Sequence, residues 1–145
     1  MNQTAALAVA LAVTILPAAP ARAEAPPPPV DESVAKRDAT AAAKAWLALI
    51  DAGKYGESWE QASSVFRGKV KKEEWVSMIG ARSSFGKLRE RKLDTATYRM
   101  IDGRPTVVIL WNASYEAMPG LTEQVAMTLD DGKWRASGYF VKPPG

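Results

Sequence analysis

Arginine, glutamate and tyrosine are the residues of this sequence that could bind or transform a ligand. The chain contains no cysteine and no histidine, which excludes thiol nucleophiles, zinc sites of the cysteine and histidine type, and triads with an imidazole base. No spacing of carboxylates indicates a metal site, and no glycine-rich loop suits a phosphate. The sequence therefore indicates no cofactor, no metal site and no identifiable catalytic residue.

Three arginines are candidates for binding an anionic group, namely Arg82, Arg91 and Arg135. A guanidinium can hold a carboxylate or a phosphate with two parallel N–H donors. Alternation along a strand would place Arg91 on the same face as Lys87 and Arg89. The simpler interpretation is an edge strand whose charges block edge-to-edge aggregation, although this interpretation explains Arg82 least.

Glu123 and Tyr139 are the candidates in the C-terminal part of the chain. We expect Glu123 on the apolar face of a hairpin, opposite Phe140, where burial would suit it to act as a base. Its position near a strand end would instead let the carboxylate reach water. We expect Tyr139 on the solvent-facing side beside Gln124, where exposed apolar sheet would mark a dimer or partner surface.

Periodicity predicts the elements that must position these candidates. Apolar residues at helical spacing predict three helices, over residues 31–51, 55–67 and 72–82. Trp46, Trp59 and Trp75 lie on the apolar stripes of these helices, where core packing is the default and a sugar or aromatic pocket is the alternative. After Lys87 the pattern alternates and predicts four strands, over residues 88–93, 106–115, 122–130 and 133–142.

The dipeptide Asp131-Gly132 predicts a type I′ turn between the last two strands. That turn sets the pairs Asp130–Lys133, Leu129–Trp134, Met127–Ala136 and Val125–Gly138. One face of the hairpin is then apolar and the other polar, as a sheet covered by helices on one side requires. We therefore predict an α+β fold with three N-terminal helices packed on one face of a curved four-stranded antiparallel sheet. By analogy, this order suggests a nuclear-transport-factor-2-like or cystatin-like cone.

Residues 1–23 have the pattern of a signal peptide, with an apolar run from Ala5 to Leu16 and a cleavage site at Ala21-Arg22-Ala23. The run is shorter than the roughly 20 residues of a spanning helix, so we predict cleavage, no stable membrane anchor, and export to the periplasm or beyond. An uncleaved anchor is the alternative. Residues 24–33 are predicted as a proline-rich spacer, 34–142 as a single domain and 143–145 as a tail.

The charges that remain after cleavage are well mixed. One of the 19 lysines and arginines lies in the signal, which leaves 18 positive against 16 negative side chains. Proteins that bind nucleic acid usually cluster their basic residues on one face. The sequence therefore argues against a nucleic-acid partner.

Three parts of the chain resemble a bacterial exported family known as domain of unknown function 4019. The segment that resembles the opening of the family is Ala45 to Tyr55 with Ser58-Trp59. The residues that resemble its middle are Trp75, Arg82 and Gly86-Lys87-Leu88 with Arg91-Lys92-Leu93. The segment that resembles the end of the family is Asp131 to Arg135 with Ser137 to Phe140. The resemblance spans residues 35–142. It implies the fold and export, and it leaves the function open because the family carries no established activity.

Three functional hypotheses follow. The leading one is a non-enzymatic exported domain that binds a small ligand or an envelope protein partner through the mouth of the cone or the outer sheet. The second is an isomerase or dehydratase type of enzyme with a buried carboxylate base and a tyrosine donor. The third is a structural homodimer formed through the outer face of the sheet.

Overall fold

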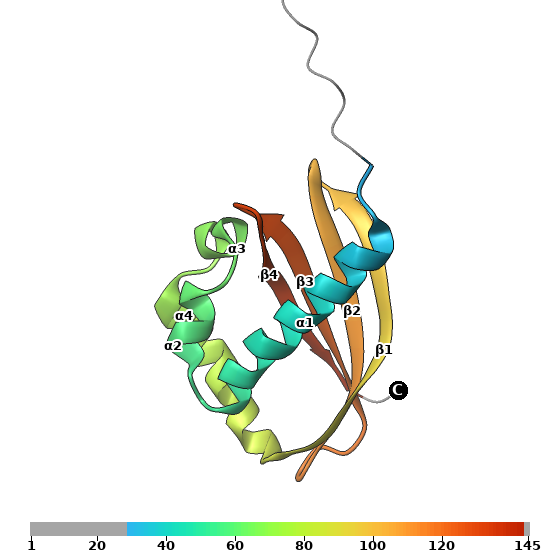
Figure 1. Ribbon diagram of the computed structural model, residues 1–145. Coiled ribbons are helices and arrows are strands. Elements are labelled where there is room, and N and C mark those ends of the chain that lie inside the picture. Colours follow the sequence, from blue (N-terminus) through green and yellow to red (C-terminus); the bar gives the residue numbers. More distant parts are fainter. Residues whose placement is uncertain (1–28, 144–145) are drawn as a thin grey trace, which may run out of the picture.

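The computed structural model describes residues 29–143, and in it every helix precedes the sheet along the chain (Figure 1). The predicted signal peptide, most of the proline-rich spacer and residues 144–145 lie outside the described residues. The helices are α1 (Glu32–Asp51), α2 (Tyr55–Glu60), α3 (Ser64–Lys69), α4 (Lys72–Gly80) and the 3₁₀ helix η1 (Ala81–Phe85). Within residues 29–143, no helix has the length and apolar character needed to cross a membrane.

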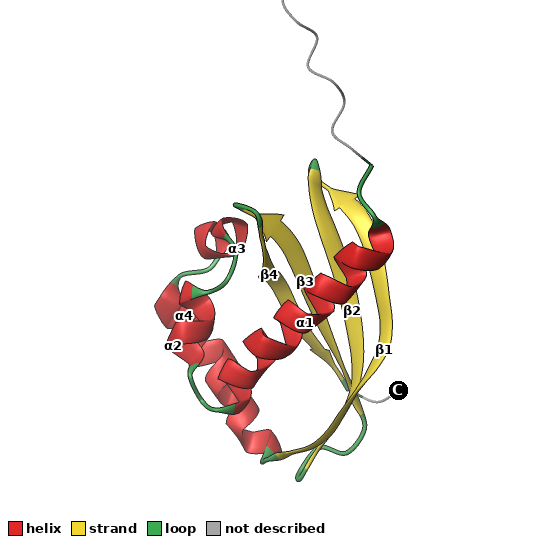
Figure 2. Cartoon of the chain, viewed as in Figure 1, coloured by secondary structure: helices red, strands yellow, loops and turns green. Residues whose placement is uncertain are grey.

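Four strands form one antiparallel sheet in the order β1-β2-β3-β4. Their bounds are β1 (Leu88–Ile101), β2 (Arg104–Tyr115), β3 (Leu121–Asp130) and β4 (Lys133–Lys142). Helix α1 crosses one face of the curved sheet and contacts all four strands, while α2 packs on α1 and α4 (Figure 2). The predicted α+β class is confirmed, and the curved, unclosed sheet fits the cone suggested by analogy.

Helix α1 approaches the sheet closely because small residues line its inner face. Ala35, Ala39 and Ala43 follow one another at four-residue spacing and are buried, which places them on one side of a helix. The Asp31 side chain caps the first turn by accepting from the backbone N–H of Ser33 at 2.9 Å. Gly53, with φ of 75°, ends the helix in the left-handed conformation that glycine allows.

The helix predicted over residues 55–67 is two helices, α2 and α3, with a break between them. Ser63 causes the break, because its side chain accepts from the backbone N–H of Phe66 at 3.1 Å and caps α3. The backbone N–H of Ser63 donates to the carbonyl of Ala136 on β4 at 2.8 Å. The break therefore fastens the helical layer to the edge of the sheet.

Tryptophan packing holds the helices together. The rings of Trp46 and Trp75 stack with centroids 5.8 Å apart. Both indole N–H groups donate to Ser58, Trp46 to its carbonyl at 2.8 Å and Trp75 to its hydroxyl at 2.9 Å. Trp59 is half-buried and donates to the carbonyl of Val70 at 2.8 Å. The default of core packing is confirmed for Trp46 and Trp75, which are 4 % exposed.

The C-terminal hairpin begins in the predicted register and then departs from it. Asp131 and Gly132 both have positive φ, and the pairs from Asp130–Lys133 to Met127–Ala136 are confirmed. A bulge then leaves Ser137 without a pairing partner. The Ser137 hydroxyl accepts from Thr128 Oγ1 at 2.8 Å and donates to the Ala126 carbonyl at 3.2 Å, which stabilises the extra residue.

The bulge overturns the predicted pairs beyond it. Val125 pairs with Tyr139 and not with Gly138, while Glu123 pairs with Val141 and not with Phe140. A shift of one residue exchanges the two faces of a strand. Tyr139 consequently lies on the helix-facing side, where the prediction had it facing solvent, and Phe140 is 65 % exposed.

Strand β1 is longer than predicted, because it continues beyond Leu93 to a turn at Asp102-Gly103. It is one of the two edge strands of the sheet, as expected. A register shift between Leu88 and Glu90 places Arg91 opposite Ala113, a buried residue of the helix-facing side. Arg89 stays exposed. The prediction that Lys87, Arg89 and Arg91 share one face is therefore wrong.

Candidate functional site

Six side chains from distant parts of the chain meet beyond the C-terminal end of α1. We call them the charge cluster, and they are Asp51 of α1, Arg82 of η1, Arg91 of β1, Tyr115 of β2, Glu123 of β3 and Tyr139 of β4. Every strand and the ends of two helices supply a member. The cluster therefore joins all four strands to α1 and η1.

Glu123 is the centre of the charge cluster and is 0 % exposed. Its carboxylate accepts from the Tyr139 hydroxyl at 2.5 Å and from the Tyr115 hydroxyl at 2.8 Å. Arg91 donates to it through Nε at 3.0 Å, and its Nη2 lies 2.9 Å away. Arg82 Nη2 approaches the second oxygen at 3.3 Å. Because every partner is a donor, the ionised carboxylate is the form that these contacts match.

Asp51 completes the cluster from the last turn of α1. Two nitrogens of Arg91 hold its two oxygens at 2.7 and 3.0 Å, and Arg82 Nη2 lies 3.4 Å from one of them. A negative charge at a helix C-terminus is unfavourable with the helix dipole, so the guanidiniums offset this cost. Two arginines then balance two carboxylates without any further charge.

The surroundings keep the tyrosines protonated and the arginines charged. Burial, reinforced by the negative charge of Glu123, raises the pKa of Tyr115 to about 12 and raises the pKa of Tyr139 further. Burial opposes the charge of Arg91, yet the hydrogen bond that it donates to Asp51 and the charge of Glu123 raise its pKa overall. Both hydroxyls therefore remain hydrogen-bond donors at neutral pH.

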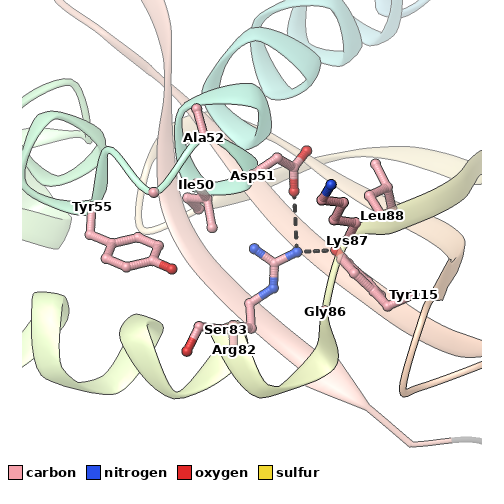
Figure 3. Close-up of a pocket in the computed structure, with 11 residues that line it drawn as sticks. Ile50, Asp51, Ala52, Tyr55, Arg82, Ser83, Gly86, Lys87, Leu88 and Tyr115 are labelled. Carbon is pink, nitrogen blue, oxygen red and sulfur yellow. Dashed lines mark hydrogen bonds and ion pairs between the residues drawn. The ribbon is translucent and has the colours of Figure 1, made fainter.

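A pocket of about 420 Å³ lies over the charge cluster, between the end of α1 and the start of β1 (Figure 3). We call it the Arg82 pocket, and its walls are Ile50, Asp51, Ala52, Gly53, Tyr55, Arg82, Ser83, Gly86, Lys87, Leu88 and Tyr115. Figure 3 shows the guanidinium of Arg82 between Asp51 and Tyr115, with Ile50 and Tyr55 on its other side. The pocket thus gives access to the edge of the cluster.

The hydrogen-bond acceptors of Arg82 all lie on one side of its guanidinium group. Its side chain is 8 % exposed, and its acceptors Asp51, Tyr115 and Glu123 all contact Nη2. Its Nε is buried without a hydrogen-bond partner, and every hydrogen bond and ion pair of the guanidinium to residues 29–143 uses Nη2, not Nη1. The carbon centre of the guanidinium lies 5.0 Å from the centroid of the Tyr115 ring, a cation–π distance that holds the group in place.

Comparison with known families identifies the domain that carries this cluster. The profile of a family described as a protein of unknown function, DUF4019, matches residues 42–139. The chain belongs to the DUF4019 family. The match contains all six members of the charge cluster, and Tyr139 is its last residue. No curated protein matches the sequence significantly.

Four site residues predicted for this DUF4019 domain lie together in the charge cluster, namely Arg82, Arg91, Glu123 and Tyr139. Arg135 lies elsewhere, with Nη1 at 3.4 Å from the carbonyl of Gln61. Sequence reasoning missed two members, Asp51 and Tyr115. The signal for Asp51 was an acid at the predicted end of a helix, where it needs a cationic partner.

Gly86 at the edge of the pocket offers a stability test. It adopts φ of 76° and ψ of −160°, and a Cβ there would lie 2.8 Å from the carboxylate of Glu116. We expect Gly86→Ala to lower the free energy of unfolding by about 1–3 kcal/mol or more, because only glycine adopts this conformation without strain. Urea denaturation measures the change.

The matched control is Gly132→Ala, which also has a positive φ but no atom within 4 Å of the added methyl group. We expect this control to cost less than Gly86→Ala. An equal cost in the two variants would mean that the approach of Glu116 contributes nothing.

Proposed function

We propose that this DUF4019 domain is an exported, non-enzymatic binding domain that holds a small anionic ligand in the Arg82 pocket. The observation that carries the proposal is the one-sided pairing of Arg82, which lines the pocket: its hydrogen bonds to residues 29–143 all use Nη2, and its Nε is buried without a partner. An unpaired donor on a nearly buried guanidinium is costly. An anionic oxygen of a ligand would remove that cost. The export part of the proposal rests on the pattern of residues 1–23 alone.

The charge of the pocket wall supports an anion. Arg82 and Lys87 contribute two positive charges and Asp51 contributes one negative charge, so the wall carries a net positive charge. Asp51 is held by Arg91 from behind, which weakens its repulsion of an incoming anion. Lys87 is exposed at the rim and has no ion-pair partner among residues 29–143, so its ammonium can turn toward a bound ligand.

The enzyme alternative receives less support from the same geometry. Glu123 would have to act as the base, but its two oxygens already accept from two tyrosines and two arginines. It does not line the Arg82 pocket. A substrate proton would therefore have to displace a donor from a fully buried carboxylate, and a general base needs direct reach to that proton.

An NMR titration of the purified protein with sodium acetate at constant ionic strength tests the proposal. We expect the Nε–H resonance of Arg82 to shift in a saturable way. In Lys87→Gln the dissociation constant should rise about 3-fold to 10-fold, because one partly exposed charge at the rim is lost.

The control for charge is Lys92→Gln. Lys92 is an exposed lysine of β1 that pairs with Glu90 at 3.0 Å, outside the pocket. The Lys92→Gln variant should bind acetate with the same dissociation constant as the unchanged protein. Acetate shifts spread over surface lysines, with no saturable shift of Arg82, would contradict the proposed function.

A further inference from the structure

The chemistry of the pocket wall also selects among anions. Resting on the proposed function, we infer that the Arg82 pocket takes a small organic monocarboxylate with a compact apolar group, in preference to phosphate or sulfate. Three features of the wall carry this inference. They are its charge, the state of its backbone amides and its apolar surface.

The charge of the wall suits a single negative charge. Arg82 and Lys87 are its only cations, and the carboxylate of Asp51 lies in the same wall with 23 % of its side chain exposed. A phosphate at neutral pH carries between one and two negative charges, which Asp51 would repel. A monocarboxylate matches the net charge of the wall and meets less repulsion.

Three backbone amides around the pocket already have acceptors. The N–H of Gly86 donates to the Ser83 carbonyl at 3.2 Å, and the N–H of Lys87 donates to the Glu116 carboxylate at 3.1 Å. On the opposite wall, the N–H of Gly53 donates to the Ile50 carbonyl at 3.0 Å. Phosphate and sulfate sites commonly use several free backbone N–H groups that converge on the ion. The amides of Gly53, Gly86 and Lys87 form no such nest, so at these three positions the recognition of an anion falls to side chains.

The remaining wall is apolar and suits the organic part of a ligand. Ile50, Ala52 and Leu88 line the pocket, together with the rings of Tyr55 and Tyr115. Figure 3 shows Ile50 and Tyr55 on one side and Leu88 and Tyr115 on the other. Leu88 is half-buried and packs beside Tyr115. A pocket of about 420 Å³ accommodates a branched acid of a few carbons. The carboxylate would lie at Arg82 and the branched group against Ile50 and Leu88.

Isothermal titration of the purified protein at constant ionic strength tests the inference with 3-methylbutanoate, acetate, 3-methylbutanamide and phosphate. We expect 3-methylbutanoate to bind about 10-fold more tightly than acetate, because its extra carbons bury apolar surface. The amide and phosphate should bind at least about 10-fold more weakly than 3-methylbutanoate. N-acetyl-leucine distinguishes two possible sources of the carboxylate. Tighter binding than 3-methylbutanoate indicates the C-terminus of a peptide, and weaker binding indicates a free acid.

Leu88→Ala tests the apolar wall by itself. It should reduce the preference for 3-methylbutanoate over acetate to about 3-fold or less. Leu93→Ala, an exposed leucine of the same strand outside the pocket, should keep the full preference. Phosphate binding more tightly than 3-methylbutanoate, or the amide binding as tightly, would overturn the carboxylate inference and leave anion binding intact. Failure of every anion to bind would overturn both.

Discussion

Replacing Glu123 by glutamine should lower the free energy of unfolding by about 3–5 kcal/mol, the usual cost of removing one partner from a buried ion pair. The side chain keeps its shape but loses the charge that Arg82 and Arg91 face at 3.3 and 2.9 Å. The two guanidiniums, 8 % and 11 % exposed, would then share the single carboxylate of Asp51. Urea denaturation followed by circular dichroism measures the loss.

Glu90→Gln is the matched control for the Glu123 variant. Glu90 pairs with Lys92 on the same sheet, but both side chains are mostly exposed, so the control should cost less than about 1 kcal/mol. If Glu123→Gln does not fold, Tyr139→Phe removes one donor and keeps the charges, at an expected cost of about 1–2 kcal/mol. Equal stability of the Glu123 and Glu90 variants would mean that the charge of Glu123 does not sustain the cluster.

The free-energy cost of burying the charges of this cluster suggests what the cluster does. A well-packed apolar group of similar volume often stabilises a fold as well as a buried ion pair does, so stability alone does not require two arginines and two carboxylates here. The cluster does hold the guanidinium of Arg82 charged and in one place, at the wall of a pocket. We interpret Arg91, Glu123 and Asp51 as residues that position Arg82 for an anion.

Local patterns in the sequence predicted most of the fold. The apolar stripe of α1 and the dipeptide Asp131-Gly132 act within a few residues, so periodicity and turn chemistry are sufficient to find them. The split between α2 and α3 was not predicted, because the apolar residues over 55–67 keep their helical spacing across Ser63, which caps α3. Its hydrogen bond to Ala136 depends on tertiary structure.

The charge cluster was only partly predictable, because one bulge decides its composition. Without an extra residue at Ser137, Tyr139 would point away from Glu123, as strict alternation predicted. Nothing in the local sequence marks Ser137 as unpaired; the contacts that stabilise it come from Thr128 and Ala126 on the neighbouring strand. Asp51 joins the cluster through Arg91, which lies forty residues later in the chain.

Raising the pH above 10 should destabilise the protein through the two tyrosines of the charge cluster. An unfolded tyrosine has a pKa near 10, whereas burial raises the pKa of Tyr115 to about 12 and that of Tyr139 further. Above pH 10 the unfolded chain therefore releases protons that the folded chain keeps. The free energy of unfolding consequently falls as the pH rises. The contribution is fully present below pH 10 and is lost as the pH rises through the folded values, by up to about 1.4 kcal/mol per pH unit for each tyrosine.

Comparison of variants isolates this effect, because every other titratable group is the same in the two proteins compared. Tyr139→Phe should be less stable than the unchanged protein at pH 8, but its free energy of unfolding should fall less steeply between pH 10 and 12. Tyr98→Phe is the matched control, because it also removes one tyrosine hydroxyl, whose hydrogen bond goes to Met100 and not to the charge cluster. Urea denaturation at several pH values gives the three slopes. A Tyr139→Phe curve parallel to the other two would show that burial beside Glu123 does not control this hydroxyl.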